Sequence, residues 1–453
     1  MFRLSEAASW IGASLQGPDV AISGVGSDTR RLRPGDLFVA LRGERFDGHD
    51  YVQEAQTRGA VAAMVSRSLE GSLPQLVVDD TRGGLARLAA AWRQKVPGRV
   101  VALTGSNGKT TCKEMLGAVL GPVGGVLATQ GNLNNEVGLP LTVLRARNED
   151  YLVLEMGANH PGEIARLVAI AAPEVALITN AGRAHLEGFG SQEGVARAKG
   201  EIILGLSPQG TLVVPADSPW TPLWRGLAGE RRVLTFGLTP QADVRSEASL
   251  LSMNWDAGGF RTRFPAHTPW GDLSLELHLA GRHNVRNALA VVAVIGALGL
   301  DPTAVASALA TVSPVPGRLQ PRLGPSGLRL VDDTYNANPD SVQAAIDVLA
   351  PLPGRRWLVL GDLAELGAEA MDLHASIGRR ALAAGLDRLS AVGPLSLAAV
   401  EAFGRGAEWF EDRASLLAAL EREVSSDDVV LVKGSRSAGM EVVAQALAGG
   451  GGG

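Results

Sequence analysis

Cysteine and long apolar runs are scarce in this chain of 453 residues. Its one cysteine, Cys112, excludes a disulfide framework and a four-cysteine metal site, and it fits a reducing compartment. The longest apolar stretch, Ala288 to Leu300, falls short of the ~20 residues that span a bilayer. Because Glu6 follows the start at once, we expect no signal peptide. These features predict a cytoplasmic protein without membrane insertion.

An excess of positive charge is also missing. The chain has 42 Lys and Arg against 47 Asp and Glu, a net charge of −5, which argues against a broad cationic face and so against nucleic acid as a partner. Lysine is especially rare and occurs only at positions 95, 109, 113, 199 and 433. Since arginine supplies nearly all the positive charge, a lysine inside a motif is expected to be needed for its amine.

The length and the pattern of strands and helices predict an α/β protein of three domains. A length of ~150 residues per domain gives about three for this chain. We expect a small N-terminal α/β domain over 1–82 and a central domain over 83–313, with a parallel sheet and antiparallel edge strands. A C-terminal, Rossmann-like doubly wound domain is expected over 314–453. Two prolines and a glycine make Ser313 to Gly317 the linker, and the five terminal glycines are expected to be a disordered tail.

A glycine-rich loop stands between a predicted strand, 99–103, and a predicted helix, 110–120. Its backbone N–H groups and the helix N-terminus suit an anion, Lys109 is placed to reach phosphates, and the Thr110 hydroxyl is suited to Mg²⁺. Leu103 occupies a position where the generic loop has glycine. The loop predicts a nucleoside triphosphate site and leaves kinase, GTPase, ATPase and ligase open. Its residues are Thr104, Gly105, Ser106, Asn107, Gly108, Lys109, Thr110 and Thr111.

Two further polar residues follow predicted buried strands. Glu155 ends the strand 151–155, where a carboxylate is costly unless it binds a cation or donors. We interpret it as a Mg²⁺ ligand, the alternative being a carboxylate that caps a helix. His185 follows the strand 175–179, at the carboxyl edge where open α/β sheets place ligands.

The short loop Thr-Gly-Ser-Asn-Gly-Lys-Thr-Thr resembles that of the Mur ligase family, ATP-dependent enzymes that build the cell-wall peptide stem, with folylpolyglutamate synthetase as a relative. Further motifs follow in order along essentially the whole chain and resemble the member that adds D-alanyl-D-alanine. They are Gly131–Gly138 (GNLNNEVG), Glu155–Glu163 (EMGANHPGE), Ala184–Gly190 (AHLEGFG), Gly281–Asn284 (GRHN), Val315–Arg318 (VPGR), Asp332–Pro339 (DDTYNANP) and Lys433–Ser437 (KGSRS).

The resemblance implies the residues that bind ATP and metal. Lys199 resembles a family lysine that CO₂ converts to a carbamate, the alternative being a solvated helix lysine. Two Mg²⁺ ions would then be held by Thr110, Glu155, His185 and the Lys199 carbamate. The implied catalytic residues are Lys109, Glu155, His185, Lys199 and Arg318. Beyond the loop, the implied ATP-binding residues are Asn287, Arg318, Asp333, Tyr335 and Asn338.

The resemblance also implies the substrates, UDP-N-acetylmuramoyl-tripeptide and D-alanyl-D-alanine. ATP would phosphorylate the terminal carboxylate of the tripeptide, and the dipeptide amine would displace the phosphate. We expect a monomer. The residues expected to bind the UDP-sugar peptide are Ser27, Asp28, Arg30, Phe38, Ala40, Gly43, Asp47, Gly48, His49, Asn134 and Asn135.

Two alternatives stay open. A sibling ligase would add the third stem residue, although the segment 332–338 fits the dipeptide enzyme better. A nucleotide-binding switch protein would make no bond, although it would have no need of Glu155, His185 and Lys199 as ligands of a second metal. The residues 312–317 are expected to form a hinge that carries Arg318 toward the phosphate loop.

Overall fold

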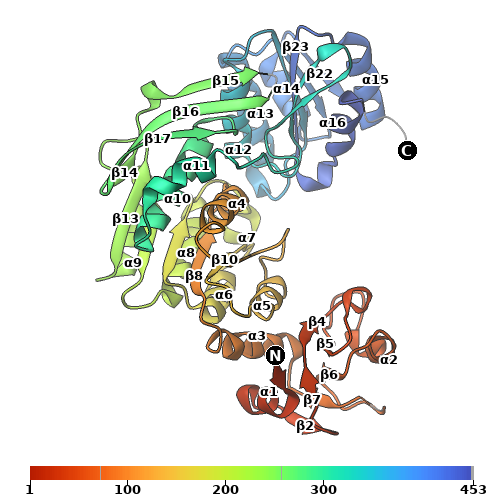
Figure 1. Cartoon of the computed structure of the whole chain (residues 1–453). Coiled ribbons are helices and arrows are strands. Elements are labelled where there is room, and N and C mark those ends of the chain that lie inside the picture. Colours follow the sequence, from red (N-terminus) through yellow and green to blue (C-terminus); the bar gives the residue numbers. More distant parts are fainter. Residues whose placement is uncertain (72, 257, 450–453) are drawn as a thin grey trace.

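A computed structural model describes residues 1–71, 73–256 and 258–449 of the chain. It confirms the predicted fold class, because three α/β parts follow one another along the sequence, each with its own sheet (Figure 1). The predicted glycine tail lies, from residue 450 on, outside the described residues. Within the described part, no helix is both long enough and apolar enough to cross a membrane.

The N-terminal part is a small sheet with the strand order β2-β7-β6-β5-β4, in which β2 alone runs antiparallel to its neighbour. A short antiparallel ribbon, β1 with β3, lies beside it. Helix α3 packs against α1 and against α5 and α6 of the central part, so it joins the two. The elements are β1 (Phe2–Arg3), α1 (Leu4–Ile11), β2 (Ser14–Gln16), β3 (Ala21–Ile22), β4 (Gly24–Gly26), β5 (Asp36–Val39), α2 (Val52–Thr57), β6 (Ala62–Val65), β7 (Gln75–Val77) and α3 (Thr81–Arg93).

The central part is a parallel sheet of order β9-β10-β8-β11-β12-β13-β14, extended by antiparallel strands β16, β15 and β17 as predicted. Its strands are β8 (Arg99–Thr104), β9 (Val126–Ala128), β10 (Tyr151–Glu155), β11 (Val175–Ile178), β12 (Thr211–Pro215), β13 (Arg232–Gly237), β14 (Val244–Arg245), β15 (Ser252–Asp256), β16 (Gly259–Thr268) and β17 (Gly271–Leu277). Its helices are α4 (Lys109–Leu120), α5 (Gly138–Val143), α6 (Glu163–Ala171), α7 (Leu186–Phe189), α8 (Gln192–Gly200), α9 (Thr221–Ala228), α10 (Arg282–Ala297) and α11 (Val305–Leu309).

Strand β8 lies within this sheet and is apolar on both faces. Its side chains alternate, as they must in a strand: Val100 and Ala102 join the core under α3 and α6, whereas Val101 and Leu103 join the core under α4 and α10. Burial on both faces explains why the sequence shows a continuous apolar run here. The carboxyl end of β8 lies between the helices that cover the two faces of the sheet, and the glycine-rich loop follows it.

The C-terminal part has the strand order β18-β19-β23-β20-β21-β22, parallel except for β18. Helices α12, α13 and α14 cover one face, and α15 and α16 the other. The elements are β18 (Gln320–Leu323), β19 (Arg329–Asp333), α12 (Pro339–Leu349), β20 (Arg355–Gly361), α13 (Ala370–Ala383), β21 (Arg388–Val392), α14 (Leu397–Phe403), β22 (Ala407–Phe410), α15 (Arg413–Glu423), β23 (Asp428–Lys433) and α16 (Glu441–Leu447).

Helix α10 begins earlier than the apolar stretch from Ala288 to Leu300. Helix α10 starts at Arg282, six residues before Ala288, with Gly281 at φ 91° as its N-cap. The polar first turns carry Asn284, whose amide donates to the Ala280 carbonyl at 2.8 Å instead of capping the helix. The first turns of α10 are polar because they line a cavity.

An ion pair joins the central and C-terminal parts. Asp340, in the first turn of α12, accepts hydrogen bonds from the Arg183 backbone N–H (2.6 Å), Nε (3.0 Å) and Nη2 (2.9 Å). A Cβ on the neighbouring Gly182 would lie 2.3 Å from the Asp340 carboxylate, so glycine allows the approach. The linker 313–317, which has neither helix nor strand, connects the two parts.

We predict that Asp340→Ala loosens this docking. Both side chains of the pair are about one-third exposed, so the loss should be about 1 kcal/mol, enough to shift a balance between docked and undocked arrangements. Small-angle scattering should show a larger radius of gyration. Asp347→Ala on the same helix is the control, because Asp347 pairs with Arg380 of α13 inside the C-terminal part. Equal radii for the two variants would contradict the prediction.

Candidate active site

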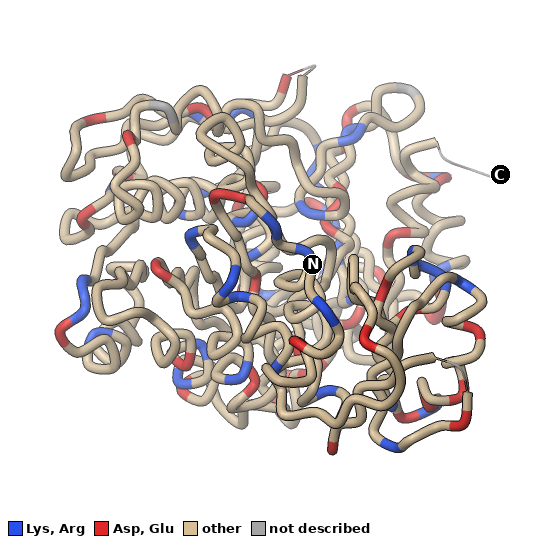
Figure 2. Tube along the Cα trace, turned by 60° about the horizontal axis from the view of Figure 1, so that its bottom comes forward, with Lys and Arg blue, Asp and Glu red and all other residues tan. Residues whose placement is uncertain are grey.

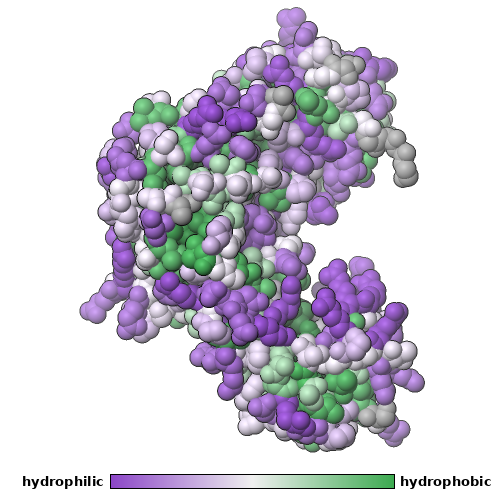
Figure 3. Space-filling view, viewed as in Figure 1, coloured by the Kyte–Doolittle hydropathy of each residue, from purple (hydrophilic) through white to green (hydrophobic). Residues whose placement is uncertain are grey.

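A cavity of about 1270 Å³ lies where the central and C-terminal parts meet. Its lining comes from the phosphate loop, the carboxyl ends of β10 and β11, the start of α10, and the segments that follow the linker and β19. A wide hollow also separates the N-terminal part, at the lower right of Figure 3, from the C-terminal part above it. The site is therefore built at the carboxyl edge of the central sheet, where ligands of open α/β sheets bind.

The phosphate loop requires its two glycines. Gly105 has φ 150°, and a Cβ there would lie 1.9 Å from the Thr179 hydroxyl. Gly108 has φ 84°, and its Cβ would lie 2.5 Å from the Asn287 side-chain oxygen. The side chain of Asn180, two residues after the end of β11, accepts from the Asn107 N–H and donates to the Asn107 carbonyl, both at 2.9 Å. Close packing thus fixes the loop on the neighbouring strand end.

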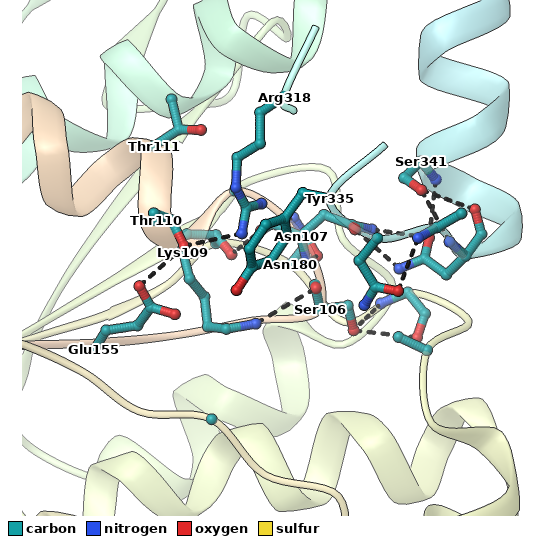
Figure 4. Close-up of a pocket in the computed structure, with 18 of the residues that line it drawn as sticks. Ser106, Asn107, Lys109, Thr110, Thr111, Glu155, Asn180, Arg318, Tyr335 and Ser341 are labelled. Carbon is teal, nitrogen blue, oxygen red and sulfur yellow. Dashed lines mark hydrogen bonds between the residues drawn. The ribbon is translucent and has the colours of Figure 1, made fainter. Parts of the chain in front are cut away.

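Lys109, Thr110 and Glu155 form the charged centre of the loop (Figure 4). Lys109 donates to the Gly105 carbonyl at 2.6 Å, and burial, assisted by the nearby Arg318, lowers its pKa although Glu155 opposes this. Glu155 is 2% exposed and accepts from Thr110 Oγ1 at 3.1 Å and from Asn134 Nδ2 at 2.8 Å. A hydroxyl and a buried carboxylate side by side are oxygen ligands of the type Mg²⁺ prefers.

Arg318 reaches this centre from beyond the linker. Its Nη2 donates to Thr110 Oγ1 at 3.2 Å, and its guanidinium lies 4.2 Å from the centre of the Tyr335 ring (Figure 4). Its buried Nε has no hydrogen-bond partner among the described residues. An unsatisfied buried donor beside a phosphate loop fits the oxygen of a phosphate group.

The remaining residues expected around ATP line the same cavity. Asn338 exchanges hydrogen bonds with Asn107 across the two parts, at 2.9 and 3.3 Å. Asn287 is 6% exposed and lies against Gly108. The Asp333 carboxylate is already engaged, since it accepts from Lys433 Nζ at 2.6 Å and from the Leu319 N–H at 3.1 Å. Burial raises the pKa of Asp333, whereas Lys433 works against that rise.

His185 lines the cavity, and both His185 and Lys199 lie close to the ring of Phe189. The Lys199 amine is 5.3 Å from the centre of the Phe189 ring, and the His185 ring meets the same ring edge-on at 6.5 Å. Lys199 is 1% exposed, and burial together with Lys109 lowers its pKa to about 7. Burial also lowers the pKa of His185, opposed by its ion-pair partner Glu365. No group of three or more His, Cys, Asp or Glu suited to a metal occurs in the described part of the chain.

The residues expected to bind the UDP end are not brought to this cavity. Asp28 pairs with the exposed Arg30 at 2.9 Å, and Asp47 with the buried ring of His49 at 2.5 Å. Ser66 donates its N–H to His49 Nε2 at 2.9 Å, so this histidine serves the local fold. Phe38 and Ala40 are buried in the core of the N-terminal part, which leaves their side chains no surface for a ligand. Ser27, Gly43 and Gly48 also lie outside the cavity lining.

Asn134 and Asn135, by contrast, do line the cavity. Asn134 holds Glu155, as described above. Asn135 Oδ1 accepts from the N–H groups of Val137 and Gly138 and so fixes the start of α5.

The scarce lysines are concentrated inside the molecule. Lys113, Lys199 and Lys433 are at most 4% exposed, and Lys109 lines the cavity. Lys95 is exposed, with its amine 5.1 Å from the Trp10 ring. Elsewhere arginine and acidic residues are interspersed along the chain (Figure 2), as the near-balanced charge leads one to expect.

Sequence reasoning missed several residues of the site. Arg183 pairs with Asp340, and Glu365 pairs with His185, each across two separate parts of the chain. No local pattern therefore marks Arg183, Asp340 or Glu365. Asn180 had a signal, since it lies two residues after a buried strand at the carboxyl edge of the sheet.

Comparison with known proteins gives three family matches along the chain. They are described as "Mur ligase family, catalytic domain" (residues 21–93), "Mur ligase middle domain" (103–295) and "Mur ligase, glutamate ligase domain" (317–436). The UDP-N-acetylmuramoyl-tripeptide--D-alanyl-D-alanine ligase of Escherichia coli is 47% identical over 447 residues, which cover 98% of each chain.

Solved structures of other proteins give the same family as the sequence comparisons. MurF from Acinetobacter baumannii has a TM-score of 0.92 at 36% identity, with 98% of both chains covered. MurF ligase from Thermotoga maritima, in complex with ADP, has a TM-score of 0.84 at 33% identity, covering 94% of this chain and 97% of that one. With matches spread over all three parts and full-length relatives well above 30% identity, the chain belongs to the Mur ligase family.

Proposed function

We propose that this chain is an ATP-dependent ligase that joins D-alanyl-D-alanine to UDP-N-acetylmuramoyl-tripeptide and releases ADP and phosphate. The observation that carries the proposal is that Arg318, from beyond the linker, reaches Thr110 beside Lys109 of the phosphate loop, while its buried Nε–H has no hydrogen-bond partner among the described residues. The Escherichia coli relative bears the name of this activity, and the Thermotoga maritima structure holds ADP. The sibling ligase for the third residue has no comparable support at this level of identity.

The reaction proceeds in two steps, formation of an acyl phosphate and its attack by an amine. A terminal carboxylate oxygen of the tripeptide attacks the γ-phosphorus of ATP, and the bond to the β-phosphate oxygen breaks, giving an acyl phosphate and ADP. The neutral amine of the dipeptide then attacks the acyl carbon, phosphate leaves, and the nitrogen loses a proton to solvent. Lys109 and Arg318 hold the transferred group and stabilise its charge. Docking of the C-terminal part excludes the water that would hydrolyse the acyl phosphate.

We also propose that the chain binds two divalent cations. Thr110 and Glu155 would hold one, and His185 with Lys199 the other. Bound Mg²⁺ would neutralise charge on the phosphate oxygens. A free ammonium would repel it, so we propose that Lys199 carries a carbamate: the neutral amine attacks CO₂, an N–C bond forms, and one proton leaves to solvent. A buried amine with a lowered pKa supports this.

Three further proposals concern the rest of the protein. We propose domain boundaries near 82 and 313, since the sheets fall within 2–77, 99–277 and 320–433. We propose that the UDP end binds the N-terminal part through main-chain groups and exposed side chains. We also propose a monomer that works in the cytoplasm, where ATP is supplied.

The assignment predicts that ADP release depends on the dipeptide. Purified chain, ATP, Mg²⁺ and UDP-tripeptide should release ADP only when D-alanyl-D-alanine is added, and free diaminopimelate or lysine should not replace it. Arg318→Ala should lower kcat about 100-fold, because a charge-stabilising donor is lost. Arg322→Ala, which removes an ion pair with Asp332 in the same segment, is the control. ADP formation that ignores the dipeptide would rule out the ligase.

The carbamate predicts that Lys199→Arg is as inactive as Lys199→Ala, with turnover lowered about 100-fold or more in both, as for a lost metal ligand. A guanidinium keeps the positive charge but is too weak a nucleophile to capture CO₂. Acetate should partly restore the alanine variant, by occupying the vacated position, and should leave the arginine variant unchanged. Arg197→Ala on the exposed face of α8 is the control for helix stability. Normal turnover of Lys199→Arg would disprove the carbamate.

A further inference from the structure

Backbone strain is concentrated around the cavity. Among the described residues other than glycine, positive φ occurs at Ala172, His185, Leu319 and Glu365. The last three all line the cavity. A non-glycine residue in this region is strained, and such strain persists where the surrounding structure holds it, often at functional sites. The distribution therefore draws attention to His185 and Glu365, which touch each other.

His185 and Glu365 come from different parts of the molecule. His185, at φ 55°, precedes α7 in the central part, and Glu365, at φ 60°, follows β20 in the C-terminal part. The His185 Nδ1 is hydrogen-bonded to the Glu365 carboxylate. The Glu187 N–H also donates to the Glu365 carbonyl, at 3.4 Å. This contact exists only while the two parts are docked.

The partner of Glu365 distinguishes it from other carboxylates of the cavity. Asp333 and Asp340 face Lys433 and Arg183, and Glu155 faces Thr110 and Asn134. Glu114, Glu136 and Glu163 are held by Lys113, by Arg166, and by the N–H groups of residues 159 and 160, respectively. Glu163 also meets an imidazole, that of His160 in its own part of the molecule, at 3.4 Å. The imidazole that faces Glu365 belongs to the other part, and it is not a permanent cation.

The hydrogen bond between His185 and Glu365 uses Nδ1 of the ring, and this determines that Nε2 is the free ring nitrogen. A neutral imidazole carries one proton, and a carboxylate at Nδ1 keeps that proton there. Nε2 then has a lone pair, and in this structure it forms no hydrogen bond with any described residue. The edge-on contact with Phe189 further limits rotation of the ring. The imidazole is thus prepared to offer Nε2 to a cation.

We propose that Glu365 is a positioning residue: by holding His185 Nδ1 from the C-terminal part, it directs Nε2 to the second divalent cation, so that this site is complete only in the docked arrangement. The inference rests on the proposed function. It agrees with the positive φ of both residues, since such strain is often held at functional sites. Ligating histidines commonly donate their other N–H to a carboxylate, which fixes ring and tautomer.

The rival role for Glu365 is direct contact with the ammonium of the incoming dipeptide. The two roles predict different behaviour of Glu365→Gln. A glutamine oxygen still accepts the Nδ1 proton, so positioning survives, whereas the charge that an ammonium needs is lost. Glu365→Gly removes both functions and, because glycine adopts positive φ freely, relieves the strain and keeps the fold.

The test measures Mn²⁺ binding by electron paramagnetic resonance on the full chain, with a non-hydrolysable ATP analogue and UDP-tripeptide bound. Glu365→Gly should weaken the second Mn²⁺ about tenfold and remove the nitrogen modulation that a ligating imidazole gives to the Mn²⁺ spin echo. Glu365→Gln should keep the modulation and bind Mn²⁺ within about threefold of the unaltered chain. Glu369→Gln, an exposed carboxylate outside the cavity lining, is the matched control.

Unchanged Mn²⁺ affinity and modulation in Glu365→Gly would overturn the inference. So would a raised KM for D-alanyl-D-alanine in both variants with Mn²⁺ binding intact, which would assign Glu365 to the dipeptide. Both results leave the ligase assignment standing if the unaltered chain forms UDP-pentapeptide. Failure of the unaltered chain to form that product would refute the proposed function instead.

Discussion

The structure depends on a concentration of positive charge that the protein neutralises only in part. Arg318 donates to the Thr110 hydroxyl, the charge of Arg318 acts on the neighbouring Lys109, and Glu155 is the carboxylate beside them. Burial strengthens every interaction between these groups. A polyanion such as a triphosphate relieves the repulsion between the two cations, and its binding energy is then available to hold the C-terminal part in place. Nucleotide binding and domain docking are therefore two aspects of one electrostatic balance.

Much of the fold followed from local pattern. The apolar run ending at Leu103, the glycines after it and the helix from Lys109 gave the strand, loop and helix of the site, because burial on both faces and left-handed backbone leave clear marks in a sequence. The start of α10 could not be read from local pattern, since the first turns of this helix are polar and face the cavity. Periodicity detects the face of a helix that packs, and it misses turns whose role is to bind.

The residues of the candidate site also fall into two groups, those that a local sequence pattern marks and those that it does not. Residues that follow strands or glycine loops, such as Glu155 and Thr110, were found from position alone. The side chains of Phe38 and Ala40 lie in a core, so their expected contact with the UDP end stays a prediction that concerns their main-chain groups. Arg183, Asp340 and Glu365 act through contacts between parts of the chain more than 150 positions apart, and no window of sequence contains both partners.

The distribution of lysine has a practical consequence for the chemistry of the surface. An amine-reactive reagent meets Lys95 and the terminal amine on the outside, because the other lysines are buried or face the cavity. Labelling of side-chain amines on the surface would therefore be confined to Lys95, just after α3 and beside Trp10. Slow labelling at Lys109 would in turn report whether the cavity is open. Because lysine is so scarce in this chain, the labelling of one residue can show whether the cavity is occupied.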